Sequence, residues 1–342
     1  MEVLPVDKAD GGLAEQLFRM YQSVHGADRP DEPPPLRDQF LARLRQSSPE
    51  LRIEWLAARA GGRVVGGAII GLPVVDNRHL LQFEAYAHPD HRRRGVGRAL
   101  LAEIRQLARD EQRRTLVSGA NRAVPGGPAR SDAGARFLTA MGFAAALESL
   151  ERRLDLPAVD PAQEQRLLAD CLPHAADYEF LSWVGPTPEP LAGGVAYLVS
   201  RLNTDAPTGA IEIAESTLDA ARLRADERVT MAVGTHLVAA AARHRATGDV
   251  AALTRVDVRP VGDHGSIWVT IADPRHRGHR LGTIVKIEVH RLVRRSFPKL
   301  RYIYTGNADE NTHMVAINER LGYAAFQAAT IYQLALQPPA AG

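Results

Sequence analysis

Two similar stretches, far apart in the sequence, constrain the fold of this chain more than any other feature. Residues 88–101 read HPDHRRRGVGRALL, and residues 273–284 read DPRHRGHRLGTI. In each, a strand pattern ends near a proline, a glycine-containing turn follows, and an apolar helix pattern begins. A chain that repeats this strand–loop–helix passage is expected to contain an internal duplication that has since diverged.

The elements predicted around the two stretches follow one order. Hydrophobic periodicity and turn residues predict, in the first half, a strand over 2–6, helices over 12–26 and 35–46, a hairpin over 51–75, a strand over 79–89, a helix over 95–112, a strand over 114–120, a helix over 132–143 and a strand over 146–156. In the second half they predict a helix over 190–203, a hairpin over 235–258, strands over 265–274, 300–308 and 329–336, and helices over 282–296 and 311–323.

This order predicts the fold class and the domain boundaries. We expect an N-terminal domain over 1–155, a connecting region over 156–175 and a C-terminal domain over 176–342. Each would be a mixed, mostly antiparallel central sheet flanked by helices, an α/β (α+β) fold built twice.

Composition narrows the class of protein. The chain has 342 residues, 45% of them hydrophobic, and a net charge of +2, which is typical of a globular protein and argues against a broad nucleic-acid-binding face. No signal-peptide pattern or apolar run long enough to span a membrane is present, and the single cysteine, Cys171, excludes an intramolecular disulfide. We therefore expect a cytoplasmic monomer or homodimer with no nucleic-acid or membrane partner.

The residues of the first stretch are suited to binding an anion. The first N–H groups of a helix have no partner within the helix and carry the positive end of its dipole. Gly95 and Gly97 permit an unusual backbone and a close approach by a ligand, and Arg92, Arg93 and Arg94 add positive charge. This combination predicts a site for a phosphate or pyrophosphate.

The spacing of the glycines excludes two common phosphate loops. The Walker loop needs a Lys-Ser or Lys-Thr pair, which is missing, and the dinucleotide fingerprint needs a third glycine where Leu100 stands. What remains is Arg-x-x-Gly-x-Gly between a strand and an amphipathic helix, and the later helix ends in FLTAMGF. On these residues the sequence resembles the GCN5-related N-acetyltransferase superfamily, of the tandem type that includes mycothiol synthase.

The resemblance implies a function and a set of cofactor-binding residues. In that family this loop binds the pyrophosphate of acetyl-coenzyme A (acetyl-CoA), and the preceding strand pairs with its pantetheine arm. The implied cofactor-binding residues are Ala85, Ala87, Arg92, Arg93, Arg94, Gly95, Val96, Gly97 and Arg98 in the first half, and Ala272, Arg277, Gly278, His279, Arg280, Leu281, Gly282, Asn307 and Asn311 in the second.

The second loop departs from the family pattern. Arg280 stands where the first glycine is expected, so we expect this loop to lose its permissive backbone while gaining a cation. The second half then either binds coenzyme A in an adjusted way or keeps the fold without it. Asn307 and Asn311 would bond the pantetheine or the substrate, or would act as turn and helix-cap residues. His276 and His279 have no metal-ligand company, so no metal is expected.

Acetyl transfer also needs groups that move protons. Glu84 is the candidate base or amine-binding carboxylate, and Tyr86 on the same strand face would shape the acceptor pocket. The tyrosine that protonates the thiolate in this family is replaced by Leu138 in the first half and by Asn318, a candidate catalytic residue, in the second.

We expect an N-acetyltransferase that passes acetyl from acetyl-CoA directly to a primary amine in a ternary complex. The alternative is a non-catalytic acyl-CoA-binding protein, for which the missing tyrosines argue. The acceptor and the catalytic half stay open.

Overall fold

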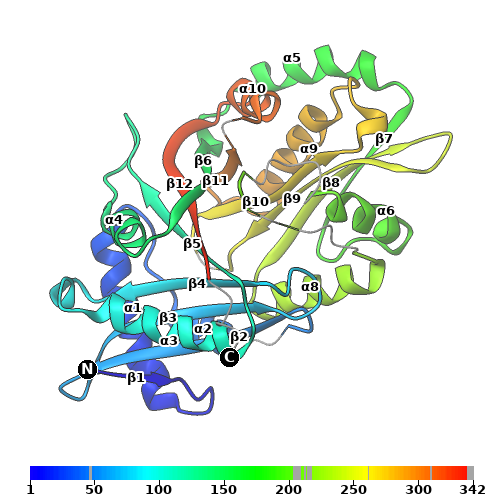
Figure 1. Ribbon diagram of the computed structural model, residues 1–342. Coiled ribbons are helices and arrows are strands. Elements are labelled where there is room, and N and C mark those ends of the chain that lie inside the picture. The colour runs from blue at the N-terminus through cyan, green and yellow to red at the C-terminus, as the bar shows by residue number, and fades with distance from the viewer. Residues whose placement is uncertain are drawn as a thin grey trace. The chain divides into compact units, whose positions relative to one another are not determined.

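The computed structural model describes residues 1–45, 48–202, 209–211, 213, 218–260, 262–308 and 310–336. Contacts divide the chain into two units (Figure 1). The N-terminal unit comprises Met1–Glu148, Gly209–Ala214 and Gln327–Gly342, and the C-terminal unit comprises Ser149–Thr208 and Glu215–Phe326. No helix among the described residues is long and apolar enough to cross a membrane.

The sheet of the N-terminal unit has the order β1-β2-β3-β4-β5-β12. Its strands are β1 (Glu2–Pro5), β2 (Leu51–Ala60), β3 (Arg63–Pro73), β4 (Leu80–Ala87), β5 (Thr115–Arg122) and β12 (Ala324–Ala335). All neighbouring pairs are antiparallel except β4 with β5.

Helices cover both faces of this sheet and enclose two cores. On one face α1 (Gly11–Asp28) and α2 (Arg37–Arg45) pack through Leu17, Phe40 and Leu44 against Trp55 and neighbouring strand residues. On the other face lie α3 (Val96–Asp110) and α4 (Ala133–Ala140). The apolar positions of α3 recur at helical spacing, and those facing the sheet are Val96, Leu100, Leu101, Ile104 and Ala108.

The C-terminal unit repeats this plan with the strand order β6-β11-β10-β9-β8-β7. Its strands are β6 (Ala144–Asp155), β7 (Tyr178–Val184), β8 (His236–His244), β9 (Val250–Val258), β10 (His264–Ala272) and β11 (Tyr302–Ala308). One core lies under α5 (Pro161–Cys171), α9 (Leu281–Ser296) and α10 (Thr312–Arg320), and the other under α6 (Glu189–Ser200) and α8 (Ala220–Ala232).

The predicted fold class is confirmed, since each unit has a mixed, mostly antiparallel sheet between helices. The predicted elements do not include α5, in the connecting region, β7 or α8. The final strands also pair differently from a simple repeat. Residues 328–335 of β12 pair with β5, and residues 149–155 of β6 pair with β11, so each unit's sheet receives the last strand of the other half of the sequence.

Candidate functional site

The N-terminal unit opens where β4 and β5 separate. These strands pair in parallel at three positions, Leu80 with Thr115, Leu81 with Leu116 and Gln82 with Val117, and both strands continue beyond them. The Phe83 carbonyl accepts from Ser118 Oγ on β5 at 2.8 Å. Because backbone groups of alternate strand residues point to opposite sides, Ala85 and Ala87 also face this gap. Their backbone groups are therefore placed to bond an extended ligand.

The first loop, residues 88–97, begins where β4 ends. The short 3-10 helix η1 (Pro89–His91) turns the chain, and Arg93 and Gly95 then adopt left-handed backbone conformations with φ of 62° and 86°. Gly95 is the N-cap of α3, so the first N–H groups of that helix point out of its end. A Cβ added at Gly97 would lie 3.0 Å from the Phe137 ring, so glycine is needed there for α3 to approach α4.

The arginines of the first loop have different partners. Arg92 donates from Nη2 to Asp28 Oδ2 at 2.7 Å and from Nε to the Ala87 carbonyl at 3.3 Å, so its charge is already paired. Arg93, Arg94 and Arg98 are exposed. These three, rather than Arg92, supply the positive charge that is available to an anion at the end of α3.

A cavity of about 640 Å³ extends from this loop to the C-terminal end of α1. Its volume is in the range of small-molecule sites. Residues from both faces of the sheet line it: Val24, Asp28, Arg29, Ala85, Tyr86, Ala87, Arg92, Arg93, Gly95, Val96, Gly97, Arg98, Gly119, Ala120, Asn121, Arg130, Ser131, Ala133, Gly134, Arg136, Phe137, Ala140 and Met141. The cavity therefore joins the anion site on one side to α1 on the other.

Comparisons with known proteins show what this arrangement is similar to. The model of the acetyltransferase (GNAT) family matches residues 14–124. A solved structure described as a tandem GNAT protein from the clavulanic acid biosynthesis pathway, without acetyl-CoA, is 28% identical, covers 98% of this chain and 99% of its own, and has a TM-score of 0.81. These findings support a tandem GNAT protein.

Two further similarities are more limited: one covers a short segment of the sequence, and the other concerns the fold alone. A mycothiol acetyltransferase from Parafrankia sp. (strain EAN1pec) is 51% identical over 49 residues, which is 14% of this chain and 14% of that protein. A GCN5-related N-acetyltransferase from Sphaerobacter thermophilus is 14% identical, covers 98% of this chain and 96% of its own, and has a TM-score of 0.69. The family uses acetyl-CoA as cosubstrate, and these similarities support an acyltransferase.

Glu84 and Tyr86 lie together on β4, on the α1–α2 side. The Tyr86 hydroxyl donates to Glu84 Oε2, and Arg43 of α2 approaches Glu84 Oε1 at 3.9 Å. Tyr21 of α1 packs edge-on against the Tyr86 ring with centroids 5.0 Å apart. Burial, and then the negative charge of Glu84, raise the pKa of Tyr86 well above its ordinary value, so its phenol stays protonated. Tyr86 lines the cavity, whereas Glu84 lies beside it.

Asp28 is a cavity residue that the sequence reasoning missed. One oxygen, Oδ2, holds Arg92, and the other, Oδ1, is buried without a hydrogen-bond partner among the described residues. A carboxylate in the last turn of α1 opposes the helix dipole, which disfavours negative charge at a C-terminus. That mismatch is the signal in the sequence that would have drawn attention to it.

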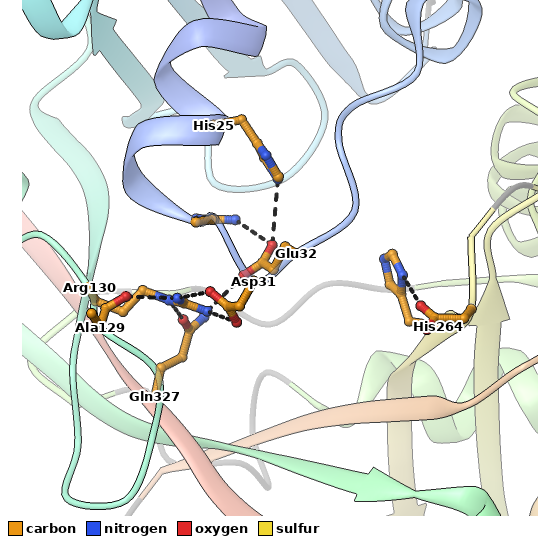
Figure 2. Close-up of polar contacts among 9 residues, drawn as sticks. His25, Asp31, Glu32, Ala129, Arg130, His264 and Gln327 are labelled. Carbon is orange, nitrogen blue, oxygen red and sulfur yellow. Dashed lines mark hydrogen bonds and ion pairs between the residues drawn. The ribbon is translucent and has the colours of Figure 1, made fainter.

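A buried arginine holds the loops at the α1 end of this cavity (Figure 2). Arg130, in the loop after β5, has a side chain 2% exposed and bonds both oxygens of Asp31, at 2.5 and 3.1 Å. It also bonds Glu32 at 3.1 Å and the side chain of Gln327 on β12. Glu32 in turn lies 3.7 Å from His25 of α1. Despite burial, His25, Arg29 and Arg130 lower the pKa of Glu32.

The second loop, residues 273–282, has the same backbone as the first. Gly278 and Arg280 adopt left-handed conformations with φ of 87° and 54°, and Arg280 is the N-cap of α9. We expected arginine to cost this loop its permissive backbone, and that expectation is wrong. Leu281 is buried at the start of α9, and an added Cβ at Gly282 would meet Ile317 at 3.6 Å, an ordinary contact.

Side chains of the second loop contact their own unit. His276 Nδ1 and the Tyr178 hydroxyl lie 2.8 Å apart, and His279 Nδ1 lies 2.9 Å from the His174 carbonyl oxygen. Arg280 lies beside the thiol of Cys171, whose pKa is nevertheless raised by burial. Cys171 is fully buried and stays a thiol, which does not suit a nucleophile. Among the described residues no group of His, Cys, Asp or Glu side chains comes together that could hold a metal ion.

The remaining predicted residues of the C-terminal unit have varied surroundings. Ala272 packs against the core near the end of β10, and Asn311 caps α10 by accepting from the Met314 N–H at 3.2 Å. Asn318 is fully buried and bonds both Lys286 and Asn307. Of the two positions where the family tyrosine is missing, Leu138 is therefore part of an apolar core and Asn318 part of a polar cluster.

Proposed function

We propose that the N-terminal unit is an N-acetyltransferase site, which passes the acetyl group of acetyl-CoA directly to a primary amine. The observation that carries this proposal is the cavity, which joins the first loop to α1 across the gap between β4 and β5. A cosubstrate bound from the α3 side and an acceptor bound from the α1 side would meet in that gap. Direct transfer then needs no covalent enzyme intermediate.

The donor side of the cavity supports acetyl-CoA as the ligand. The N–H groups at the start of α3, with Arg93 and Arg98, would hold the pyrophosphate. The backbone of Ala85 and Ala87 would pair with the pantetheine arm, as a further strand pairs with a sheet edge. The backbone groups of Ala85 and Ala87 that face this gap have no strand partner on β5, and the Ala87 carbonyl would exchange its bond with Arg92 for one with the ligand.

The pair of Glu84 and Tyr86 supports a route for the protons. The amine nitrogen attacks the thioester carbonyl, the C–N bond forms, the C–S bond breaks, and Glu84 takes the proton that the amine loses. Tyr86 gives its proton to the leaving thiolate and takes the proton held by Glu84. Because a phenolate beside Glu84 is disfavoured, the two transfers through Tyr86 would be concerted. This route replaces the tyrosine that is missing at Leu138.

The proposal is tested by titrating acetyl-CoA into the full chain and into the Gly95→Glu variant. Glutamate places bulk and negative charge at the end of α3, and we expect binding there to weaken by about a hundredfold or more. Gly62→Glu is the matched control: Gly62 also has a left-handed φ, 77°, and an added Cβ meets nothing within 4 Å. Equal binding by both variants would contradict the assignment of this loop.

Turnover is measured separately, as thiol release from acetyl-CoA with a panel of primary amines. We expect release with at least one amine and its loss in Gly95→Glu. Tight binding without release for any amine in the panel would favour the non-catalytic acyl-CoA-binding alternative, which the apolar Leu138 motivates.

A further inference from the structure

Three polar side chains of the C-terminal unit form a chain that begins deep in its core. Lys286 Nζ on α9 donates to Asn318 Oδ1 on α10 at 2.6 Å, and Asn318 Nδ2 donates to Asn307 Oδ1 on β11 at 2.5 Å. Lys286 and Asn318 are fully buried, and Asn307 is half-buried. We call these three residues the polar triad.

The N-terminal unit has apolar residues at the same places in its fold. Three markers match positions in the two units: the N-cap residue of the helix after the loop, the glycine at the end of the next helix, and a glycine on the intervening strand. By these markers Leu101, Leu138 and Ala120 correspond to Lys286, Asn318 and Asn307. The first three pack in one apolar core, so the whole set differs between the units.

A buried polar triad is costly, and nothing in the packing of the fold requires it. Among the described residues, Lys286 has no carboxylate partner: it bonds Asn318 and lies 5.1 Å from the centre of the Tyr323 ring. Desolvation lowers its pKa to about 7. Buried polar groups that are kept at such a cost are commonly functional.

The hydrogen bonds of the triad all run in one direction. The lysine donates to one amide oxygen, and that amide donates to the next, which polarises each group in turn. The amide nitrogen of Asn307 ends the series and has no acceptor in the part of the chain that the structure describes. The triad therefore presents a strengthened N–H donor.

This donor lies where the strands of the C-terminal unit separate. Strands β10 and β11 pair in parallel only at His264–Tyr302, Gly265–Ile303 and Ser266–Tyr304. Asn307 lies beyond these positions, and the corresponding Ala120 lines the cavity of the N-terminal unit. A ligand in this gap would lie beside Asn307. The amide N–H group of Asn307 could then donate to an oxygen atom of the ligand.

We propose that Asn307 holds the acyl carbonyl oxygen of a thioester in the C-terminal unit, and that Lys286 acts through Asn318 as the residue that positions it. The inference rests on the proposed use of acetyl-CoA by this chain. The second loop supports it, since its left-handed pair Gly278 and Arg280 keeps the helix N-terminus in the form that offers N–H groups to phosphate. The C-terminal unit would thus distinguish acyl-CoA from free coenzyme A.

The test compares acetyl-CoA with coenzyme A, which lacks the acyl carbonyl. Both are titrated into the full chain carrying Gly95→Glu, so that only the C-terminal unit can bind. We expect acetyl-CoA to bind about tenfold more tightly than coenzyme A, as one strengthened hydrogen bond allows. Asn307→Ala should remove this preference and leave the affinity for coenzyme A unchanged. Lys286→Met and Asn318→Leu should do the same.

Thr312→Ala is the matched control, because Thr312 is exposed in the first turn of the same helix as Asn318 and lies outside the triad. It should keep the preference. Three results would overturn the inference: no binding to the Gly95→Glu chain, equal affinities for the two ligands, or a preference that survives Asn307→Ala. Since Asn307 is half-buried, this last variant remains decisive even if the core variants fail to fold.

Failure here is distinguishable from failure of the proposed function. The chain carrying Gly282→Glu tests the N-terminal site with the second loop altered. If that chain binds acetyl-CoA and releases thiol while the Gly95→Glu chain binds nothing, the proposed function stands and the inference about Asn307 falls.

Discussion

The two loops have one backbone and different residues. In the first loop the left-handed positions hold Arg93 and Gly95, and in the second they hold Gly278 and Arg280. Glycine and arginine have exchanged places, yet both loops end as the N-cap of a long helix. The turn into the helix is therefore required by the fold, and the residue that adopts it is not. What a loop can do chemically depends on the side chains around it.

The side chains around the two loops differ on the face of each sheet that lies opposite α3 or α9. In the N-terminal unit β4 carries Glu84 and Tyr86 beside α1 and α2. In the C-terminal unit the matching positions of β10 are Val269 and Ile271, which are buried in the apolar core under α6. Thr270 between them bonds Thr254 at 2.6 Å. This face of the C-terminal unit offers no carboxylate on β10 for an amine.

The largest expected effect follows from that contrast. Glu84→Gln removes the proton acceptor and should lower kcat by about 10²- to 10⁴-fold. Affinity for acetyl-CoA should not change, because Glu84 lies on the α1–α2 side of the sheet, away from the first loop. Steady-state thiol release with an amine that supports turnover measures the first effect, and calorimetry the second.

Glu54→Gln is the control for this variant. Glu54 lies on β2, which β3 separates from β4, and its half-exposed side chain pairs with Arg52. It should be silent in both assays. Full activity of Glu84→Gln would remove the chemical distinction between the two units and would transfer the search for a base to Asp28.

The second effect concerns stability at the α1 end of the N-terminal cavity. Arg130→Ala would leave Asp31 and Glu32 without their buried cation, and breaking a buried pair in this way costs about 3 kcal/mol or more. Chemical denaturation measures the loss. Arg19→Ala, which breaks an exposed pair with Glu15, should cost no more than about 1 kcal/mol. Similar small losses for both would show that the cluster does not hold these loops.

The third effect is a pH dependence of the free energy of unfolding that arises from the C-terminal unit. Because burial lowers the pKa of Lys286 from 10.5 to about 7, the unfolded chain binds more protons than the folded one between these values. The free energy of unfolding should therefore rise with pH over this window and be lowest, with respect to this group, below pH 7. From pH 7 to 9 the gain is about 2 kcal/mol.

Lys286→Met provides the reference for that change. The variant should be more stable than the wild-type chain at pH 7, and the difference should narrow toward pH 9. Denaturant unfolding at both pH values measures this, with Leu101→Met, the matching position of the N-terminal unit, as a control that shows no such narrowing. A constant difference would mean that Lys286 is charged throughout in the folded chain.

Local patterns in the sequence account for most of this fold. Helical spacing in α3, alternation in β4 and the glycine turn of the β2–β3 hairpin each depend on neighbouring residues, so each could be predicted. The pairing of β12 with β5 could not, because a strand pattern indicates that a strand forms and not which edge it joins. The helix α5 lies in the region that the sequence predicts as a connection, because its amphipathic run is short.

The residues of the candidate site also fall into those that local patterns predict and those that they do not. The first loop, with Gly95 and Gly97, could be found because a turn and a helix start have local signatures. Asp28 and Arg130 could not, since their importance comes from partners remote in the sequence. The buried state of Lys286 was also hidden, because lysine on an amphipathic helix is ordinarily a surface residue.

The smallest expected effect returns to the exchanged glycine and arginine. Arginine in the left-handed region costs roughly 1 kcal/mol relative to glycine. Gly95→Arg should destabilise the N-terminal unit by about that amount, because an added Cβ meets only Met1 at 3.7 Å and the backbone conformation sets the cost. Arg280→Gly should gain less, about 0.5 kcal/mol, since glycine also loosens the unfolded chain and the contact with Cys171 is lost.

Hydrogen exchange in α3 and α9 measures the two changes separately, because the altered residue is the N-cap of each helix. Faster exchange in α3 for Gly95→Arg, with unchanged or slower exchange in α9 for Arg280→Gly, is the expected pair of results. Faster exchange in both would show that Arg280 stabilises its loop through its side chain. In that case the second loop would owe its shape to the contact with α5, and the likeness of the two backbones would rest on different interactions.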